Sequence, residues 1–191
     1  MEAAASDEMK IGVLIYNRQT PVDAALKAAV DDLRARGFRV GGLLQRSGDT
    51  RPSGICTMWL DDIASGHAIR LDQQRGPGAM ACLLDPDALA RGAVLLRQAI
   101  EAGMDVVVVN RFGGAEADGG GLRQEIAEAV FSGAAVLIAV RDSLLPDLQG
   151  FLGIPVVLLP PSAPLIADWA AAAAPARDGN ATREQSGAGS W

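Results

Sequence analysis

Cysteine, histidine and aromatic residues are scarce in this 191-residue chain, which has two cysteines, one histidine and 4% aromatic residues. Two cysteines do not make a disulfide framework, and one histidine leaves little for a zinc site. The chain also lacks an apolar run of about 18 residues, the length that a membrane helix needs. Its first residues have neither the basic nor the apolar stretch of a signal peptide. We therefore expect a cytoplasmic protein without a membrane partner.

The chain does not carry an excess of positive charge either. The 17 lysines and arginines face 23 aspartates and glutamates, which gives a formal net charge of −6. An acidic chain without a basic block is a poor match for nucleic acid or for an anionic membrane surface. Hydrophobic residues make up 49% and charged residues 21%, a balance that excludes a disordered chain and allows a packed core.

The chain is expected to consist of one domain and two tails. Residues 1–9 are small and acidic and are predicted to be flexible. Residues 176–191 are polar and contain glycines, and we predict a disordered tail there. Residues 10–175 are left for a single domain, which matches the usual size of about 100–200 residues.

Apolar runs that alternate with helical patterns predict a three-layer α/β domain with a mostly parallel sheet. Residues 105–110 include four consecutive valines, which are typical of a central strand buried on both faces. Residues 58–63 and 67–72 flank a turn and predict a β-hairpin inserted into the α/β core. Further strands are expected at residues 11–16, 40–45, 134–140 and 155–159.

The first helix is predicted to begin near Thr20. Thr20 is a capping residue, Pro21 suits the first helical position, and Asp23 is expected to complete a capping box. Apolar residues then recur on one helical face until Gly37 ends the helix.

Ligands of open parallel sheets bind beyond the carboxyl ends of the strands, so the residues at those ends are the candidate site. They supply amides, guanidinium groups and backbone N–H groups, with few candidate bases. This set favours an anion or a small polar molecule over proton-transfer chemistry. We assign no catalytic residue and no metal ligand. The candidate ligand-binding residues are Asn17, Gln45, Arg75, Gly78, Cys82, Asn110, Arg111, Gly113, Glu116, Gly120, Gly121 and Arg123.

The loop after the valine-rich strand is the most informative segment. Gly120 and Gly121 precede a predicted helix, whose free N–H groups attract anions. Arg111 and Arg123 supply bidentate donors for an oxyanion, and Glu116 is placed to orient an arginine. The alternative is a surface loop in which the glycines allow tight turns and Glu116 is the ion-pair partner of Arg123.

The first strand–helix loop tests for a nucleotide phosphate site. A phosphate-binding loop needs glycines that wrap the phosphates, and a lysine followed by Ser or Thr. Residues 16–23 contain neither glycine nor lysine, Pro21 lacks an N–H donor, and Asp23 adds negative charge. A standard triphosphate cradle is therefore disfavoured, and a nucleotide is the less favoured ligand.

A second candidate segment lies at residues 74–82. Arg75 lies beside glycines that include Gly78, so a guanidinium and backbone donors are presented together. Cys82 is either a pocket residue or, as is common for free cysteines, a small buried hydrophobe.

Several short segments between residues 11 and 159 together carry a family resemblance. They are RG at residues 36–37, GLLQ at 42–45, LDDIASG at 60–66, GPGA at 76–79, CLLDP at 82–86 and NRFGGAE at 110–116, with Gly119, Gly121, Leu122 and Arg123. With these segments the chain resembles a bacterial domain-of-unknown-function family related to the thermophile-type nucleoside triphosphatases. Members of that family are often encoded near molybdate-transport or molybdenum-enzyme genes. The resemblance implies a degenerate P-loop NTPase fold, and the family typically has lysine where Arg111 stands.

The resemblance also identifies what has changed. In the triphosphatases the corresponding strand ends in an Asp-Glu pair, followed by a glycine and a further glutamate. Asn110 and Arg111 occupy the places of the pair, and Glu116 resembles the later glutamate. Gln45 stands near another of their acids. Neutral and cationic groups thus replace the acids that hold magnesium, which favours an anion without a metal.

These observations predict a non-catalytic binding or regulatory module for a small oxyanion or a phosphorylated metabolite. The resemblance implies a link to molybdenum metabolism, with molybdate or another oxyanion as the ligand. One alternative is a nucleotide hydrolase or transferase with an atypical phosphate loop. Another is a protein-interaction adaptor, and a homo-oligomer or a protein partner is compatible with each of these functions.

Overall fold

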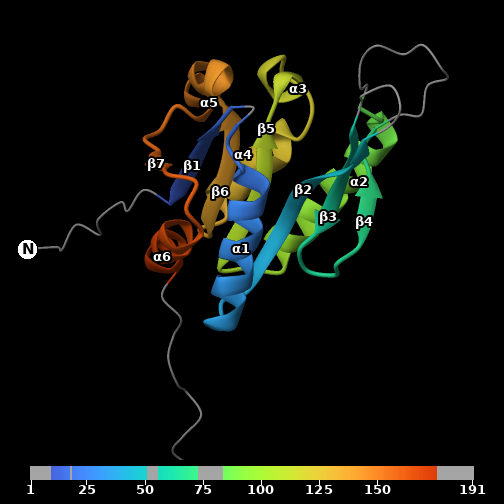
Figure 1. The fold of residues 1–191 in the computed structure, drawn as a ribbon. Coiled ribbons are helices and arrows are strands. Elements are labelled where there is room, and N and C mark those ends of the chain that lie inside the picture. Colours follow the sequence, from blue (N-terminus) through green and yellow to red (C-terminus); the bar gives the residue numbers. More distant parts are fainter. Residues whose placement is uncertain (1–9, 18, 51–55, 73–83, 176–191) are drawn as a thin grey trace, which may run out of the picture.

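A seven-stranded sheet forms the centre of the computed structural model, which describes residues 10–17, 19–50, 56–72 and 84–175 (Figure 1). Its strand order is β4-β3-β2-β5-β6-β1-β7. The pairs of β1 with β6 and β7, and of β5 with β2 and β6, are parallel, while β3 runs antiparallel to β2 and β4. The strands are β1 Ile11–Tyr16, β2 Val40–Thr50, β3 Cys56–Asp62, β4 Ala68–Arg70, β5 Val106–Phe112, β6 Ala135–Arg141 and β7 Val157–Leu159.

Helices cover both faces of the sheet, so the predicted three-layer α/β architecture is confirmed. Helices α1 and α6 share an apolar core with one face, and α2, α4 and α5 pack on the other. None of the helices in the described ranges has the length and apolar character needed to cross a membrane. The helical elements are α1 Val22–Ala35, α2 Pro86–Glu101, α3 Gly114–Ala117, α4 Arg123–Phe131, the 3₁₀ turn Asp142–Leu144, α5 Leu145–Leu152 and α6 Ala163–Ala173.

The valine-rich strand β5 lies in the middle of the sheet, as predicted. Val106, Val107, Val108 and Val109 are each at most 1% exposed, with β2 on one side of the strand and β6 on the other. Burial of both faces explains the unbroken apolar run, since a strand with one wet face would alternate. The carboxyl end of β5 is consequently anchored by a strand that is buried on both faces.

Strand β2 is longer than predicted. The sequence led us to expect a strand that ends at Gln45 and a polar loop from Arg46, but the strand continues to Thr50. Its first residues pair with β5, and from Leu43 onward it pairs with β3. The polar residues fit a strand because the antiparallel arm has a face that is not packed in the core, where charged side chains are tolerated. The predicted hairpin is confirmed as β3 and β4.

The start of α1 also differs from the expected capping box. The residue before the helix is Pro21, and no side chain caps the first turn. Thr20 instead donates from Oγ1 to Asn17 Oδ1 at 3.0 Å, which closes the loop between β1 and α1. Asp23 is turned away because it binds the guanidinium group of Arg111. A charged partner outcompetes a neutral backbone N–H group for a carboxylate.

Candidate functional site

The carboxyl ends of β1, β5 and β6 meet at one edge of the sheet. Strand β6 lies between the other two, with Tyr16 beside Arg141 and Phe112 beside Val140 in register. Asn17 follows β1 at this edge, where its Oδ1 accepts from the Gln19 backbone N–H at 2.9 Å. This edge therefore brings the predicted residues of the β1 loop close to those of β5.

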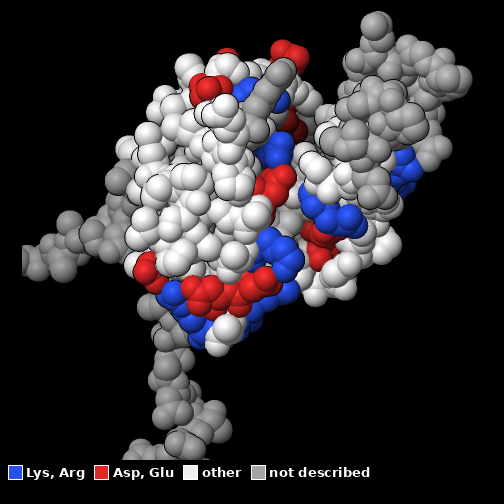
Figure 2. Space-filling view, in the orientation of Figure 1, with Lys and Arg blue, Asp and Glu red and all other residues white. Residues whose placement is uncertain are grey.

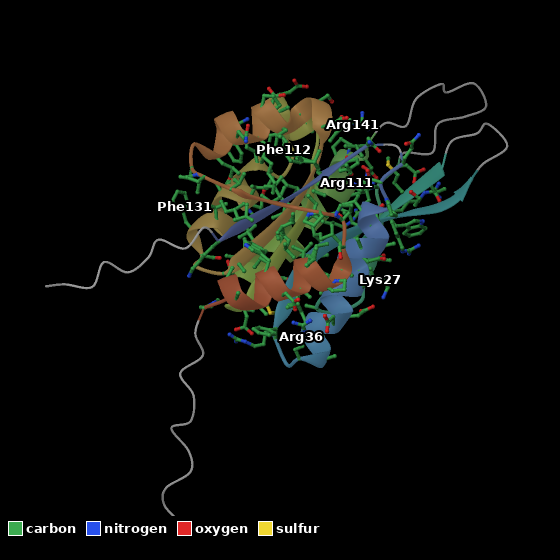
Figure 3. All side chains as sticks on the ribbon, turned by 60° about the vertical axis from the view of Figure 1, so that its left-hand side comes forward. Lys27, Arg36, Arg111, Phe112, Phe131 and Arg141 are labelled. Carbon is green, nitrogen blue, oxygen red and sulfur yellow. The ribbon has the colours of Figure 1, made fainter. Side chains whose placement is uncertain are left out.

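An ion pair joins the end of β5 to the start of α1. Nη2 of Arg111 donates to both carboxylate oxygens of Asp23 at 2.7 Å, and the guanidinium lies 4.6 Å from the centroid of the Tyr16 ring. The two side chains are 25% and 26% exposed, so solvent reaches the pair although most of it is covered. Figure 3 shows Arg111 beside the first turn of α1.

Asn110, the residue before Arg111, is strained and buried. It is 1% exposed and has a φ of 74°, in the left-handed region that non-glycine residues seldom adopt. A register shift between Val108 and Asn110 marks a bulge in the strand. Within the described residues, Asn110 Oδ1 and Arg111 Nε are buried atoms without a hydrogen-bond partner. Strain and unpaired polar groups of this kind concentrate at functional sites.

The glycine loop after β5 wraps around a carboxylate of the protein itself. Glu116 is 6% exposed and accepts backbone N–H groups from Gly113 and Leu122, both at 2.9 Å. Gly121 has a φ of +62°, and a Cβ there would lie 2.0 Å from Glu116 Oε1. The N–H of Gly120 bonds the Ala115 carbonyl at 2.8 Å. Some of the backbone N–H groups of this loop are therefore already bonded to Glu116 or to the loop's own carbonyl groups.

Arg123 has two contacts that explain a cation at the start of a helix. Its Nη1 donates to the backbone carbonyl of Glu116 at 2.9 Å, and its guanidinium lies 4.2 Å from the centroid of the Phe151 ring. Phe151 also stacks on Phe112, with ring centroids 6.0 Å apart. Arg123 thus contacts Glu116 through the backbone carbonyl, whereas the Glu116 carboxylate, expected as its ion-pair partner, accepts backbone N–H groups.

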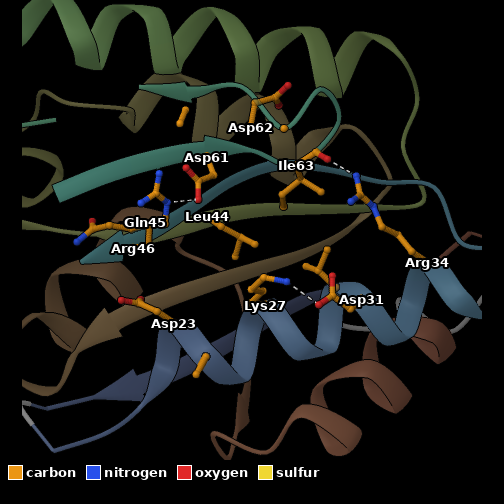
Figure 4. Close-up of a pocket in the computed structure, with 14 residues that line it drawn as sticks. Asp23, Lys27, Asp31, Arg34, Leu44, Gln45, Arg46, Asp61, Asp62 and Ile63 are labelled. Atoms are coloured by element: carbon orange, nitrogen blue, oxygen red, sulfur yellow. Dashed lines mark hydrogen bonds and ion pairs between the residues drawn. The ribbon is translucent and has the colours of Figure 1, made fainter. Parts of the chain in front are cut away.

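A cleft of about 470 Å³ opens between α1 and the β2–β3 arm. Gln45 lies in this cleft, from the middle of β2, and Asp23 lines it from the first turn of α1 (Figure 4). Figure 2 shows acidic and basic side chains alternating along a hollow on this face. The lining residues are Asp23, Ala24, Lys27, Val30, Asp31, Arg34, Leu44, Gln45, Arg46, Asp61, Asp62, Ile63, Gly66 and Ala68.

Four charged side chains of the cleft form two ion pairs within it. Lys27 bonds Asp31 at 2.7 Å on the helix wall. Arg46 bonds Asp61 at 2.6 Å on the opposite wall and stacks on Trp59 at 5.1 Å. The cleft therefore presents pairs of opposite charge around apolar residues of α1, β2 and the β3–β4 turn.

Three predicted residues, Arg75, Gly78 and Cys82, fall in the 73–83 segment, outside the described residues. The remaining ones divide between two places. Asn17, Asn110, Arg111, Gly113, Glu116, Gly120, Gly121 and Arg123 belong to the β1 and β5 ends and the loop that follows β5, whereas Gln45 belongs to the cleft. Across the described ranges, no three His, Cys, Asp or Glu side chains form a group placed to hold a metal ion.

The model of a family described as "Protein of unknown function (DUF2478)" matches residues 11–169. The chain belongs to this family. A curated relative named "Molybdenum import ATP-binding protein ModC 2", from Bradyrhizobium diazoefficiens, is 34% identical over 153 residues. The match covers 80% of this chain but 17% of that protein, so the chain spans about a sixth of the relative's length.

Two solved structures share the fold of this DUF2478 member. A human cancer-related nucleoside triphosphatase has a TM-score of 0.56 at 15% identity, covering 77% of this chain and 87% of its own. THEP1 from the hyperthermophile Aquifex aeolicus also has a TM-score of 0.56, at 13% identity, covering 80% and 89%. The chain therefore shares its fold with these two proteins.

Sequence reasoning missed the partners that give the site its geometry. The local pattern predicts a capping role for Asp23 and places Tyr16 at the end of a strand. Both contact Arg111, from positions 88 and 95 residues away in the chain. The available signal for this ion pair was an acidic residue, Asp23, in the first turn of α1, together with an arginine, Arg111, that stands at a strand end without an obvious partner. The cleft carboxylate Asp61 had no such signal.

Proposed function

We propose that this DUF2478 domain is a non-catalytic binding or regulatory module for a small oxyanion or a phosphorylated metabolite. The observation that carries the proposal is the Arg111–Asp23 pair at the carboxyl end of β5. A partly exposed guanidinium at this edge attracts oxyanions through charge-assisted hydrogen bonds. The same guanidinium disfavours a magnesium ion at this edge, because it repels a cation and supplies none of the oxygen ligands that magnesium prefers.

The two acids nearest to this arginine along the strand and helix are already engaged. Asp23 binds Arg111 through both oxygens, and Glu116 accepts two backbone N–H groups. These bonds hold both carboxylates against the protein's own groups, whereas a general base or a metal ligand must direct a lone pair at the reacting group. The arrangement therefore favours binding over hydrolysis.

The group that we propose Arg111 binds is a tetrahedral oxyanion, either free, as in molybdate, or as the phosphate group of a metabolite. The curated relative is named as a molybdenum import protein, and this supports a link to molybdenum metabolism. Because the match covers only 17% of that protein, its named activity is carried over here only as a proposal. We place the module in the cytoplasm, as the sequence predicts.

An alternative function is a nucleotide hydrolase or transferase with an atypical phosphate loop. The likeness in fold to two nucleoside triphosphatases favours it. The loop between β1 and α1 opposes it, because Pro21 supplies no N–H group and Asp23 places a carboxylate at the start of α1. A second alternative is a protein-interaction adaptor, which predicts no response to small anions.

A thermal-shift screen separates these functions. The purified chain is tested with molybdate, tungstate, phosphate, sulfate, ATP and GTP, each with and without magnesium. A binding oxyanion stabilises the fold by about 2.7 kcal/mol at a hundredfold excess over Kd. We expect stabilisation by an oxyanion without magnesium and no nucleotide turnover. Magnesium-dependent turnover of ATP or GTP contradicts the proposal, and no response to any of these ligands supports the adaptor.

A further inference from the structure

Asp23 belongs both to the ion pair at the strand end and to the cleft. Its carboxylate binds Arg111 Nη2 through both oxygens, and the residue also lines the 470 Å³ space between α1 and the β2–β3 arm (Figure 4). Any ligand that takes the guanidinium of Arg111 therefore changes the surroundings of a carboxylate that faces the cleft.

An anion alone binds Arg111 at a cost. When an oxyanion takes over Nη2, the Asp23 carboxylate, which is 26% exposed, loses its partner. A mostly covered charge without a partner is unfavourable. The nearby cations are already in use, since Lys27 binds Asp31 at 2.7 Å and Arg46 binds Asp61 at 2.6 Å. Among the described residues that line the cleft, a cation can therefore pair with Asp23 only if it gives up a contact that it already makes.

We infer that the ligand of this site is a zwitterion, in which the oxyanion binds Arg111 and an ammonium group binds Asp23 inside the cleft. Such a ligand replaces both halves of the existing ion pair, so neither side chain is left unpaired. The inference deepens the proposed function and rests on it. It narrows the phosphorylated metabolites to small phosphate esters that carry an amine.

The rest of the cleft suits the carbon chain between the two charges. Ala24, Leu44 and Ile63 supply apolar surface next to Asp23. In the described part of the chain, the amide nitrogen of Gln45 has one weak contact, with the Met58 sulfur at 3.9 Å, so it is available to a polar atom of the ligand.

The test compares two pairs of ligands that differ only in the amine. O-phosphoethanolamine is matched with ethyl phosphate, and 3-aminopropyl phosphate with propyl phosphate. Dissociation constants are measured by titration calorimetry at one salt concentration. We expect at least one amine to bind about tenfold tighter than its matched ester, the scale of a charge-assisted hydrogen bond. Equal affinities within both pairs would overturn the inference.

Three variants assign the gain to Asp23. Asp23→Asn is expected to remove the advantage of the amine, while ethyl phosphate binds equally well or tighter because Arg111 is released. Asp23→Glu keeps the charge and is expected to keep part of the advantage. Asp87→Asn is the matched control, because Asp87 also lies in the first turn of a helix, α2, but is exposed and does not line the cleft. We expect this variant to change the ratio of the two dissociation constants, ester to matched amine, less than twofold. Thermal unfolding of each variant verifies that it is folded.

The failures of the two proposals are distinguishable. Binding of ethyl phosphate that depends on Arg111, without a gain from either amine, overturns the zwitterion and leaves the proposed function intact. An amine advantage that survives in Asp23→Asn also overturns the zwitterion inference. No binding of any phosphate ester, phosphate or molybdate overturns both.

Discussion

Glu116 Oε1 accepts the backbone N–H of Leu122 at 2.9 Å, and this bond fixes the start of α4 against the loop that follows β5. Its other oxygen accepts the N–H of Gly113, so one buried carboxylate ties together both ends of the loop. We expect Glu116→Ala to lower the free energy of unfolding by about 2–4 kcal/mol, because two covered N–H groups lose their acceptor. Glu116→Gln keeps one oxygen and is expected to cost less. Urea denaturation measures both, and a loss under about 0.5 kcal/mol in Glu116→Ala contradicts this role.

Gly42 lies where β2 leaves β5 for the hairpin arm. It has a φ of +105°, and a Cβ there would lie 2.1 Å from the backbone oxygen of Val108. Gly42→Ala is expected to destabilise the fold by more than about 3 kcal/mol, since neither the backbone angle nor the space admits a side chain. Gly37 is the matched control, with a φ of +88° and no neighbouring atom within 4 Å.

Gly37→Ala carries the cost of the backbone angle alone, about 1–2 kcal/mol. The difference in unfolding free energy between the two variants, measured by chemical denaturation, therefore gives the cost of the steric overlap with β5, apart from the cost of the backbone angle. Equal losses in the two variants would contradict the close approach of Gly42 to the backbone of Val108.

Arg123 is held by a carbonyl oxygen and by an aromatic ring. Arg123→Ala is expected to lower stability by about 1–2 kcal/mol, because a hydrogen bond and a cation–π contact are both lost. The exposed Arg91 on α2 serves as a control, and Arg91→Ala is expected to stay within about 0.5 kcal/mol of the original protein. Thermal unfolding of both variants without ligand measures the difference, and identical midpoints would remove the structural role of Arg123.

The sequence predicted the parts of the fold that depend on local pattern. The valine run of β5 and the turn between β3 and β4 have periodicities that specify burial and pairing directly. The continuation of β2 beyond Gln45 was missed because polar residues on the outer face of an antiparallel arm look like a loop. The helix start was mispredicted because Asp23 has a partner 88 residues away, which no local rule detects.

The sequence proposes Arg111 and Asn110 as site residues because they stand at the carboxyl end of the valine-rich strand, where ligands of open α/β sheets bind. Their role in binding stays a prediction. The glycines of the following loop were interpreted as donors for an external anion. The structure gives a further reason for a glycine at position 121, because a side chain there would overlap the Glu116 carboxylate. The cleft could not be predicted, because it depends on how α1 packs against the β2–β3 arm, and sequence pattern does not specify that packing.

The central claim is that Arg111 binds an oxyanion without a metal, and titration calorimetry with the oxyanion that the thermal screen selects tests it most directly. The measurement uses the original protein, Arg111→Lys, Arg111→Gln and, as a control at the end of the neighbouring strand, Arg141→Gln. We predict that Arg111→Gln weakens binding by about tenfold or more, that Arg111→Lys weakens it less, and that Arg141→Gln and removal of magnesium change it little. An affinity unchanged in Arg111→Gln, or one that requires magnesium, would contradict the account.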